Sequence, residues 1–247
     1  MNYKERKELP YTIPKVCTYP YFTALNAILE VNGIEEGWIL NNYILIWLMR
    51  DMYDIDYWID FKFGNEEMQE DFCPMIKKYI FSREELERES CNIEEVIKES
   101  INKECYVMVS VDVFYISNWW MPNMERRHFR HQLCIYGYDF EDTEELLVAD
   151  FIGGKYKKLR ISLENFKKGY YEYSSYVPYE SFGDDIWLLS INKEKNESFS
   201  LKKNIWLLED FLLSQDTHII NHIQLEKKEH KYAFGLNVFE ELVKYVY

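Results

Sequence analysis

The chain is short of positive charge, of long apolar runs and of glycine-rich loops. Its 247 residues include 29 Lys and Arg against 43 Asp and Glu, a formal net charge of -14. Nucleic-acid binding depends on clustered basic side chains that neutralise phosphates, so this balance argues against a nucleic-acid partner. The most apolar run, residues 43–49, is far too short to cross a bilayer core of about 30 Å. We therefore expect neither nucleic acid nor membrane as a partner.

The cysteines are odd in number and scattered, and their spacing argues against the common metal sites. The five cysteines follow none of the spacings typical of zinc ligands. His218, His222, Glu226 and His230 recur every four residues, but ligands in line on one helix do not converge on a metal ion. No glycine-rich phosphate loop or dinucleotide fingerprint is present. The first residues lack the apolar stretch of a signal peptide. These features predict a reduced, cytoplasmic protein without metal or cofactor.

Helical patterns come first along the chain. A helix is expected from about Pro20 to the stop signal at Gly33, because proline is favoured at the first helical position. Ser82 followed by Glu85 fits a capping box. The remaining expected helices cover residues 35–52, 66–78, 82–103 with a break near Asn92, 201–213, 217–229 and 232–247.

Strand patterns occupy the middle of the chain. They cover residues 106–116, 132–138, 146–151, 156–161 and 186–191. Helices followed by strands, without regular alternation, predict an α+β fold with an antiparallel sheet. A polar stretch at residues 192–198 divides the chain into an expected core, residues 1–192, and a helical appendage packed on it, residues 193–247.

One histidine and one aspartate fall on neighbouring predicted strands. His131 opens an apolar strand, and Asp150 ends the next strand after a Gly-Tyr-Asp turn. Adjacent antiparallel strands would hold the two side chains close enough for the acid to orient the imidazole. Such a pair forms the base and orienting group of a nucleophilic triad. The third member should be a thiol or hydroxyl near the start of an early helix, where Cys17 lies.

These short motifs resemble the N-terminal domain family named for butirosin biosynthesis protein H, which is similar to C39-type cysteine peptidases. The resemblance rests on VDVFYI at residues 111–116, His131 before its strand, GYD at 137–139, VAD at 148–150 and the closing YAFGLNVFEELVKYV. It implies a papain-like core and a Cys17–His131–Asp150 triad. The implied reaction passes an acyl group from a carrier-protein thioester to an amine acceptor, forming an amide in peptide or natural-product biosynthesis. We expect it to run through an acyl-Cys17 intermediate, with His131 as the general base and Asp150 holding the imidazole.

The chain departs from the family at the nucleophile. The family cysteine lies about thirteen residues before the glycine that ends the first helix, which is the place of Pro20 here. Either Cys17 fills the same space from three residues earlier, or the site has lost its thiol. The nearby hydroxyls of Thr18 and Thr23 are poorer nucleophiles. Two alternatives to the transferase therefore stay open: a C39-like cysteine peptidase or hydrolase, and a degenerate protein that binds an acyl or peptide ligand.

An aromatic loop, residues 117–130, precedes His131. Trp119 and Trp120 are too apolar for a plain solvent loop, so they form either core at the sheet edge or the wall of an acyl pocket. Arg126, Arg127 and Arg130 make a local basic cluster, which is either simply solvated or able to receive an acidic partner. We assign substrate contacts to Trp119, Trp120, Arg130 and Tyr136.

Overall fold

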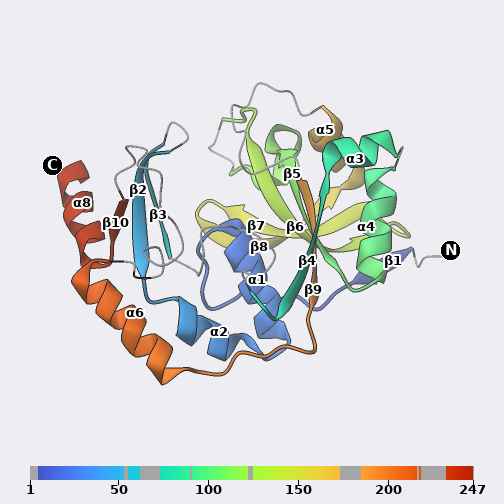
Figure 1. Cartoon of the computed structure of the whole chain (residues 1–247). Helices are drawn as coiled ribbons and strands as arrows, with labels where there is room; N and C mark the ends of the chain where they lie inside the picture. The colour runs from blue at the N-terminus through green and yellow to red at the C-terminus, as the bar shows by residue number, and fades with distance from the viewer. Residues whose placement is uncertain are drawn as a thin grey trace. The chain divides into compact units, whose positions relative to one another are not determined.

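The computed structural model describes residues 5–52, 55–61, 73–89, 91–121, 125–172, 185–215, 217 and 232–246. The chain divides into two compact units (Figure 1). Unit 1 contains Met1–Val31 and Ile76–Asn192, and unit 2 contains Asn32–Met75 and Lys193–Tyr247. Unit 1 thus ends at Asn192. However, the structure groups residues 32–75 with the C-terminal segment rather than with the core.

Unit 1 is built on an antiparallel sheet of the order β4-β9-β5-β6-β7-β8, in which β1 also pairs with β6. The strands are β1 (Arg6–Glu8), β4 (Ile76–Ser82), β5 (Tyr106–Asp112), β6 (Arg130–Asp139), β7 (Glu145–Ile152), β8 (Lys155–Ser162) and β9 (Asp185–Ile191). All seven residues of β5 are buried, so β5 lies in the middle of the core. The α+β fold with a large antiparallel sheet is thus confirmed.

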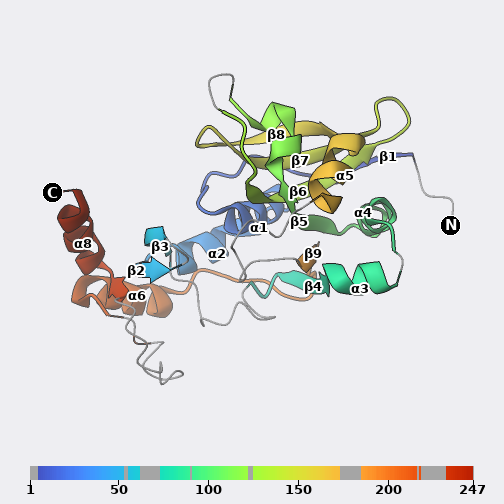
Figure 2. The same ribbon diagram turned by 90° about the horizontal axis from the view of Figure 1, so that it is seen from above.

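Three helices of unit 1 pack on interior strands of its sheet (Figure 2). Helix α1 (Pro20–Val31) contacts β6 and β7, and helices α4 (Ile93–Asn102) and α5 (Leu163–Tyr171) contact β5. Ten consecutive residues of α1, from Pro20 to Leu29, are buried, which fits a helix covered on all sides. Short helix α3 (Arg83–Arg88) begins with the predicted capping box of Ser82 and Glu85. Gly33 has a φ of +67°, as expected for a glycine that follows a helix.

Unit 2 combines a three-stranded antiparallel sheet, of the order β10-β2-β3, with helices. Its elements are α2 (Glu35–Asn42), β2 (Ile46–Met52), β3 (Ile55–Phe61), α6 (Leu201–Leu213), β10 (Tyr232–Phe234) and α8 (Leu236–Val246). The helix predicted over residues 35–52 is wrong beyond Asn42, because the apolar run that follows forms the central strand β2. Its backbone groups are satisfied by β3 and by β10, which lies about 180 residues further along the chain.

Other boundaries also differ from the predictions. Residues 76–78 belong to strand β4 rather than to a helix, and the stretch 232–234 is strand β10 before α8 begins. Helix α5 and strand β1 were not predicted. The rest of the helix expected over 66–78 lies mostly outside the described residues. The helix expected over 217–229 lies outside them except for Thr217, and so do His218, His222 and His230. Within the described residues, every helix is too short or too polar to cross a membrane.

Candidate functional site

The predicted proximity of His131 and Asp150 is confirmed. His131 Nε2 lies 2.7 Å from Asp150 Oδ1. β6 and β7 pair with Cys134 opposite Ala149, and continuing this register places Leu133 opposite Asp150. His131 is two residues before Leu133, so the pair forms diagonally on one face of the sheet. Asp150 is fully buried, whereas the His131 side chain is 18% exposed.

Trp119 provides a donor to this pair that its sequence position did not reveal. Its indole Nε1 donates to Asp150 Oδ2 at 2.5 Å, and the backbone N–H of Phe151 donates to Oδ1 at 2.7 Å. With the imidazole, the buried carboxylate thus has three donors, which is what a buried charge requires. Because Asp150 faces Nε2, that nitrogen carries the proton when the imidazole is neutral, and Nδ1 is left as the basic atom.

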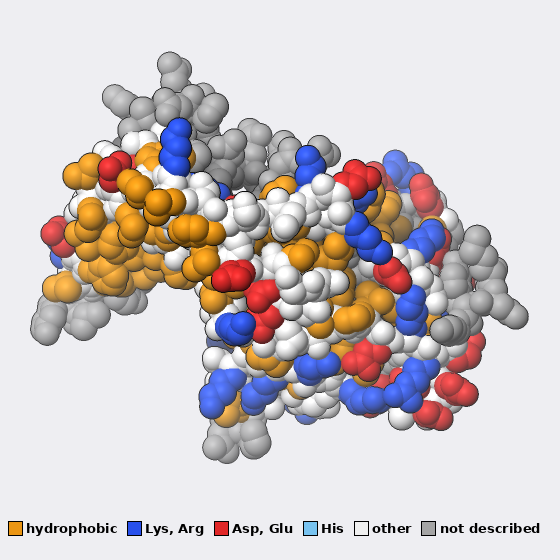
Figure 3. Space-filling model, turned by 90° about the horizontal axis from the view of Figure 1, so that it is seen from below, with side chains coloured by type: hydrophobic (Ala, Val, Ile, Leu, Met, Phe, Trp, Pro, Cys, Tyr) orange, Lys and Arg blue, Asp and Glu red, His pale blue; other side chains and the backbone are white. Residues whose placement is uncertain are grey.

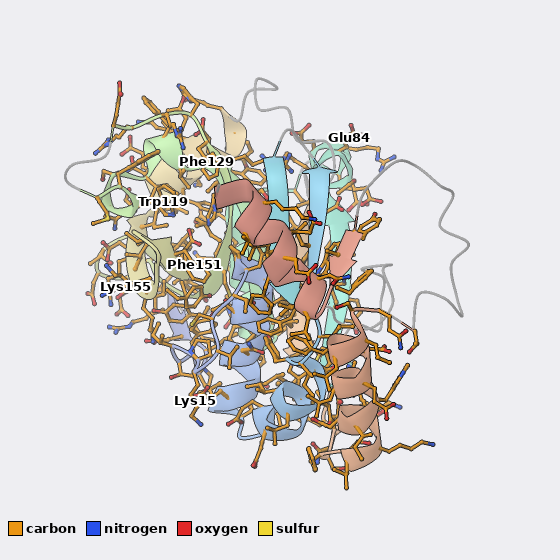
Figure 4. The ribbon with its side chains drawn as sticks, turned by 90° about the vertical axis from the view of Figure 1, so that its left-hand side faces the viewer. Lys15, Glu84, Trp119, Phe129, Phe151 and Lys155 are labelled. Carbon is orange, nitrogen blue, oxygen red and sulfur yellow. The ribbon has the colours of Figure 1, made fainter. Side chains whose placement is uncertain are left out.

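Aromatic rings surround the imidazole. The ring of Trp119 lies 5.4 Å from that of His131, and Phe129 stacks on His131 at 5.8 Å. Figure 4 shows Trp119, Phe129 and Phe151 in the same part of unit 1, with Lys155 beside them. These rings limit the access of water to the imidazole while leaving it partly exposed.

Cys17 lies in the segment that precedes α1. Its Sγ donates to the backbone carbonyl of Pro14 at 3.3 Å. Although Cys17 is exposed, desolvation of its thiol, together with the negative charge of Glu30, raises the pKa of the thiol. Helix α1 begins at Pro20, three residues later, and proline offers neither a thiol nor a backbone N–H at that place. The surroundings of Cys17 therefore favour the thiol over the thiolate, which is the nucleophilic form.

The hydroxyl of Thr23, one of the other candidate nucleophiles, already has a structural bond. Thr23 is fully buried in α1, and its Oγ1 accepts a hydrogen bond from the backbone N–H of Thr18 at 2.9 Å. This bond fixes the chain as it enters the helix. It fits a structural role for Thr23 better than a catalytic one.

Two of the predicted substrate contacts are core residues. Trp120 is 8% exposed, and its Nε1 donates to the carbonyl of Val113 at 2.8 Å. Tyr136 is buried, stacks on Tyr11 with ring centroids 4.8 Å apart, and has Lys158 Nζ 4.5 Å from its ring centroid. Arg130 is half-buried on β6, opposite Asp112. Trp119, by contrast, contacts both members of the His131–Asp150 pair.

A second imidazole–carboxylate pair lies at the end of β5. His128 Nδ1 is 2.6 Å from Asp112 Oδ2, and the imidazole stacks on Phe114 with centroids 4.1 Å apart. Asp112 Oδ1 accepts the backbone N–H groups of Phe114 and Phe129, at 3.0 and 3.1 Å. Asp112 therefore ties together the two ends of the aromatic loop. His128 lies outside the predicted strands, so the strand pattern gave no sign of this pair. The sequence signal that it had was Asp112, the aspartate at the end of β5.

Comparisons with known proteins add no relative. A scan against protein-family models finds no match, and a search of curated proteins finds no similar sequence. Within the described part of the chain, no group of three or more His, Cys, Asp or Glu side chains could hold a metal ion. The chemistry of the site therefore has to be inferred from its own residues.

Proposed function

We propose that unit 1 is a papain-like acyltransferase domain that passes an acyl group from a thioester to an amine, forming an amide. The observation that carries the proposal is the His131–Asp150 pair, in which a fully buried carboxylate holds Nε2 at 2.7 Å. Support comes from helix α1, which packs on the two strands that bear this pair. A helix packed on an antiparallel sheet that carries His and Asp on adjacent strands is also what the family resemblance implies.

In this proposal His131 acts as the general base. Nδ1 of His131 removes a proton from the acceptor amine while the amine nitrogen attacks the thioester carbonyl carbon. The C–N bond forms, the C–S bond then breaks, and the imidazolium returns its proton to the leaving thiolate. The reaction is balanced without metal, oxidant or reductant. Asp150 stabilises the transient positive charge on the imidazole and keeps the ring oriented.

The acceptor attacks the thioester directly in our proposal, rather than an acyl-Cys17 intermediate. The raised pKa of the Cys17 thiol and its hydrogen bond to Pro14 support this choice. A covalent route through Cys17 requires the thiol to lose its proton to His131 first. The two routes differ in whether replacement of Cys17 abolishes transfer.

Basic side chains near the site suit an acidic carrier protein as the donor. Lys157 lies opposite Asp150 in the β7–β8 register and is exposed, as is Lys155 at the start of β8. Arg126 and Arg127, in the loop before His131, are exposed as well. In a chain of net charge -14, these residues offer a local surface to which a negatively charged carrier is attracted.

The proposal is tested with an acyl-N-acetylcysteamine thioester and a primary amine, with amide formation followed by mass spectrometry. Wild type is compared with His131→Ala, Asp150→Asn, Cys17→Ser and His128→Ala. His128→Ala is the matched control, because it also removes an imidazole bound to a buried aspartate. We expect His131→Ala to lower the rate by roughly 10²- to 10⁴-fold, the usual contribution of a general base. Cys17→Ser and His128→Ala should keep most of the activity.

The other outcomes separate the alternatives. Loss of activity in Cys17→Ser, with an acyl adduct mapped to Cys17 in wild type, would establish the covalent route. Release of free acid in place of amide would indicate a hydrolase. If His131→Ala and wild type show the same background rate, acyl transfer by this site is refuted. The second candidate function, ligand binding without turnover, is favoured by Pro20 at the first position of α1 and would then lead.

A further inference from the structure

Two helices of unit 2 present apolar stripes to solvent. On α6 the stripe consists of Leu201, Ile205, Leu208 and Leu212, whose spacing of three or four residues places them within about 60° of arc. On α8 it consists of Leu236, Phe239 and Val243, with the same spacing. The seven side chains are between 43% and 63% exposed. Figure 3 shows apolar side chains gathered over this part of unit 2.

The opposite sides of these helices already pack inside unit 2. Leu207 and Asp210 of α6 are buried, as is Val238 of α8, against which the partly buried Leu242 packs. The exposed stripes are thus a second apolar face on helices whose core-facing side is satisfied. We call this surface the α6–α8 face. An amphipathic surface helix normally has one apolar stripe, so the second stripe needs a partner of its own.

We propose that the α6–α8 face is the interface of a homodimer, in which two copies of α6 pack antiparallel. Half-exposed side chains of this size present on the order of 100 Å² each, or roughly 700 Å² together. That exceeds the largest apolar patch of about 300–600 Å² on a typical monomer. It approaches the roughly 800 Å² that each partner contributes to an interface of standard size.

The charge of the face permits self-association despite the charge of the chain. Helix α6 carries Lys202 and Lys203 against Glu209 and Asp210, so its net charge is zero, although the whole chain carries -14. Two copies can therefore meet at α6 without local like-charge repulsion. An anionic membrane surface is a poorer occupant, because it would repel the chain as a whole.

The positions of two charged residues select the antiparallel arrangement. Lys202 and Glu209 are exposed and lie on the same flank of the α6 stripe, at its opposite ends. In an antiparallel pair centred between Ile205 and Leu208, Lys202 of each copy lies beside Glu209 of the other, which forms two equivalent ion pairs. A parallel pair would instead place this flank against the flank formed by Asn204 and Phe211. Charges beside an apolar helix seam commonly set orientation in this way.

The test is the molar mass of the full chain by light scattering after size-exclusion chromatography, over a wide range of concentrations. We expect twice the chain mass of 30.2 kDa. Leu208→Glu should raise the dissociation constant at least about tenfold, as for a residue at the centre of an interface. Lys202→Glu should weaken the dimer, because it places a second carboxylate beside Glu209 of the other copy. The double exchange Lys202→Glu with Glu209→Lys should restore it.

All three positions are exposed, so the variants should fold, and far-UV circular dichroism checks that they do. A monomer at every concentration overturns the proposal. A dimer indifferent to Leu208→Glu overturns the assignment to the α6–α8 face. A dimer that Leu208→Glu dissociates, but that the double exchange fails to restore, overturns the antiparallel arrangement. Binding to vesicles, or to another protein, by a chain that stays monomeric would likewise refute self-association. No outcome depends on acyl transfer.

Discussion

Replacing Trp119 tests whether Asp150 is a charged group held by three donors. Trp119→Phe keeps an aromatic ring but removes the N–H that donates to Asp150 Oδ2 at 2.5 Å. A hydrogen bond to a charged group contributes about 1.5–3 kcal/mol, against about 1 kcal/mol for a neutral one. Asp150 is fully buried, so water cannot replace the lost donor. We expect the local free energy of opening to fall by about 2–3 kcal/mol.

The neighbouring residue supplies a matched control. Trp120→Phe makes the same chemical change, but its indole donates to the neutral carbonyl of Val113 at 2.8 Å. Trp120 is also the more buried of the two, so a cost set by lost apolar burial alone would be larger for Trp120. If the charge of Asp150 sets the cost, Trp119→Phe is the more damaging change by about 1 kcal/mol.

Hydrogen exchange of the β6 and β7 amides measures these opening free energies, and it avoids treating a chain of two units as one cooperative transition. A double-mutant cycle with Asp150→Asn completes the test. In the Asp150→Asn background the charge is gone, so the excess cost of Trp119→Phe should shrink by about 1 kcal/mol. The reasoning fails if Trp120→Phe costs as much as Trp119→Phe, or if Asp150→Asn leaves the difference unchanged.

Two further predictions concern the core of unit 1. Burial raises the pKa of Cys134 to about 12 from 9.0, so this thiol stabilises the fold fully below pH 9 and loses its contribution as the pH rises toward 12. Between pH 9 and 12, the free energy of unfolding measured with urea should fall more steeply in wild type than in Cys134→Ala, by roughly 1 kcal/mol per pH unit; equal slopes would contradict this. Gly137→Ala should cost about 1–3 kcal/mol and speed amide exchange in β1, because its Cβ would lie 2.7 Å from the carbonyl oxygen of Lys7 and 2.9 Å from Leu147 Cδ1. In the control Gly154→Ala the added Cβ meets nothing within 4 Å and the cost comes from the φ of +74° alone, so β1 exchange should stay unchanged.

Local signals predicted those parts of the fold that depend on neighbouring residues. The capping box at Ser82 and Glu85, the helix start at Pro20 and the left-handed Gly33 are all decided within a few residues, and all three occur in the structure. Strand β2 shows the opposite case. Its sequence fits a buried helix as well as a strand, and the choice is made by hydrogen bonds to β10, which no local pattern contains.

In the site, too, some features follow from the order of the chain and others depend on contacts between distant residues. β6 and β7 are consecutive antiparallel strands, so the chain order alone places His131 near Asp150. The roles of Trp119 and Asp112 depend on how the loop between β5 and β6 folds back. That path is set by hydrogen bonds from side chains to backbone, such as those from Phe114 and Phe129 to Asp112. The residues that form such bonds do not recur at a regular spacing, so no sequence pattern predicts them.

The two imidazole–carboxylate pairs can be compared with each other, because both join a histidine to a buried aspartate. Asp112 and Asp150 are each buried, and each accepts two further donors besides an imidazole. A buried aspartate whose oxygens are all hydrogen-bonded, one of them to a histidine, therefore occurs twice in this fold and can be purely structural. The pairs differ in their surroundings: the His128 side chain is 54% exposed, whereas that of His131 is 18% exposed and lies among Trp119 and Phe129.

A general base works best where water is scarce, since charge development on the imidazole is then compensated by the fixed carboxylate rather than by solvent. By that criterion we propose His131 as the reactive imidazole, whereas His128 is bound to the aspartate that holds the loop. Removing His128 should therefore loosen the segment that carries Trp119 while leaving the acid–base pair in place. The contrary result is that His128→Ala abolishes acyl transfer as completely as His131→Ala. The difference in exposure between the two imidazoles would then not explain catalysis, and the assignment of His131 as the base would be refuted.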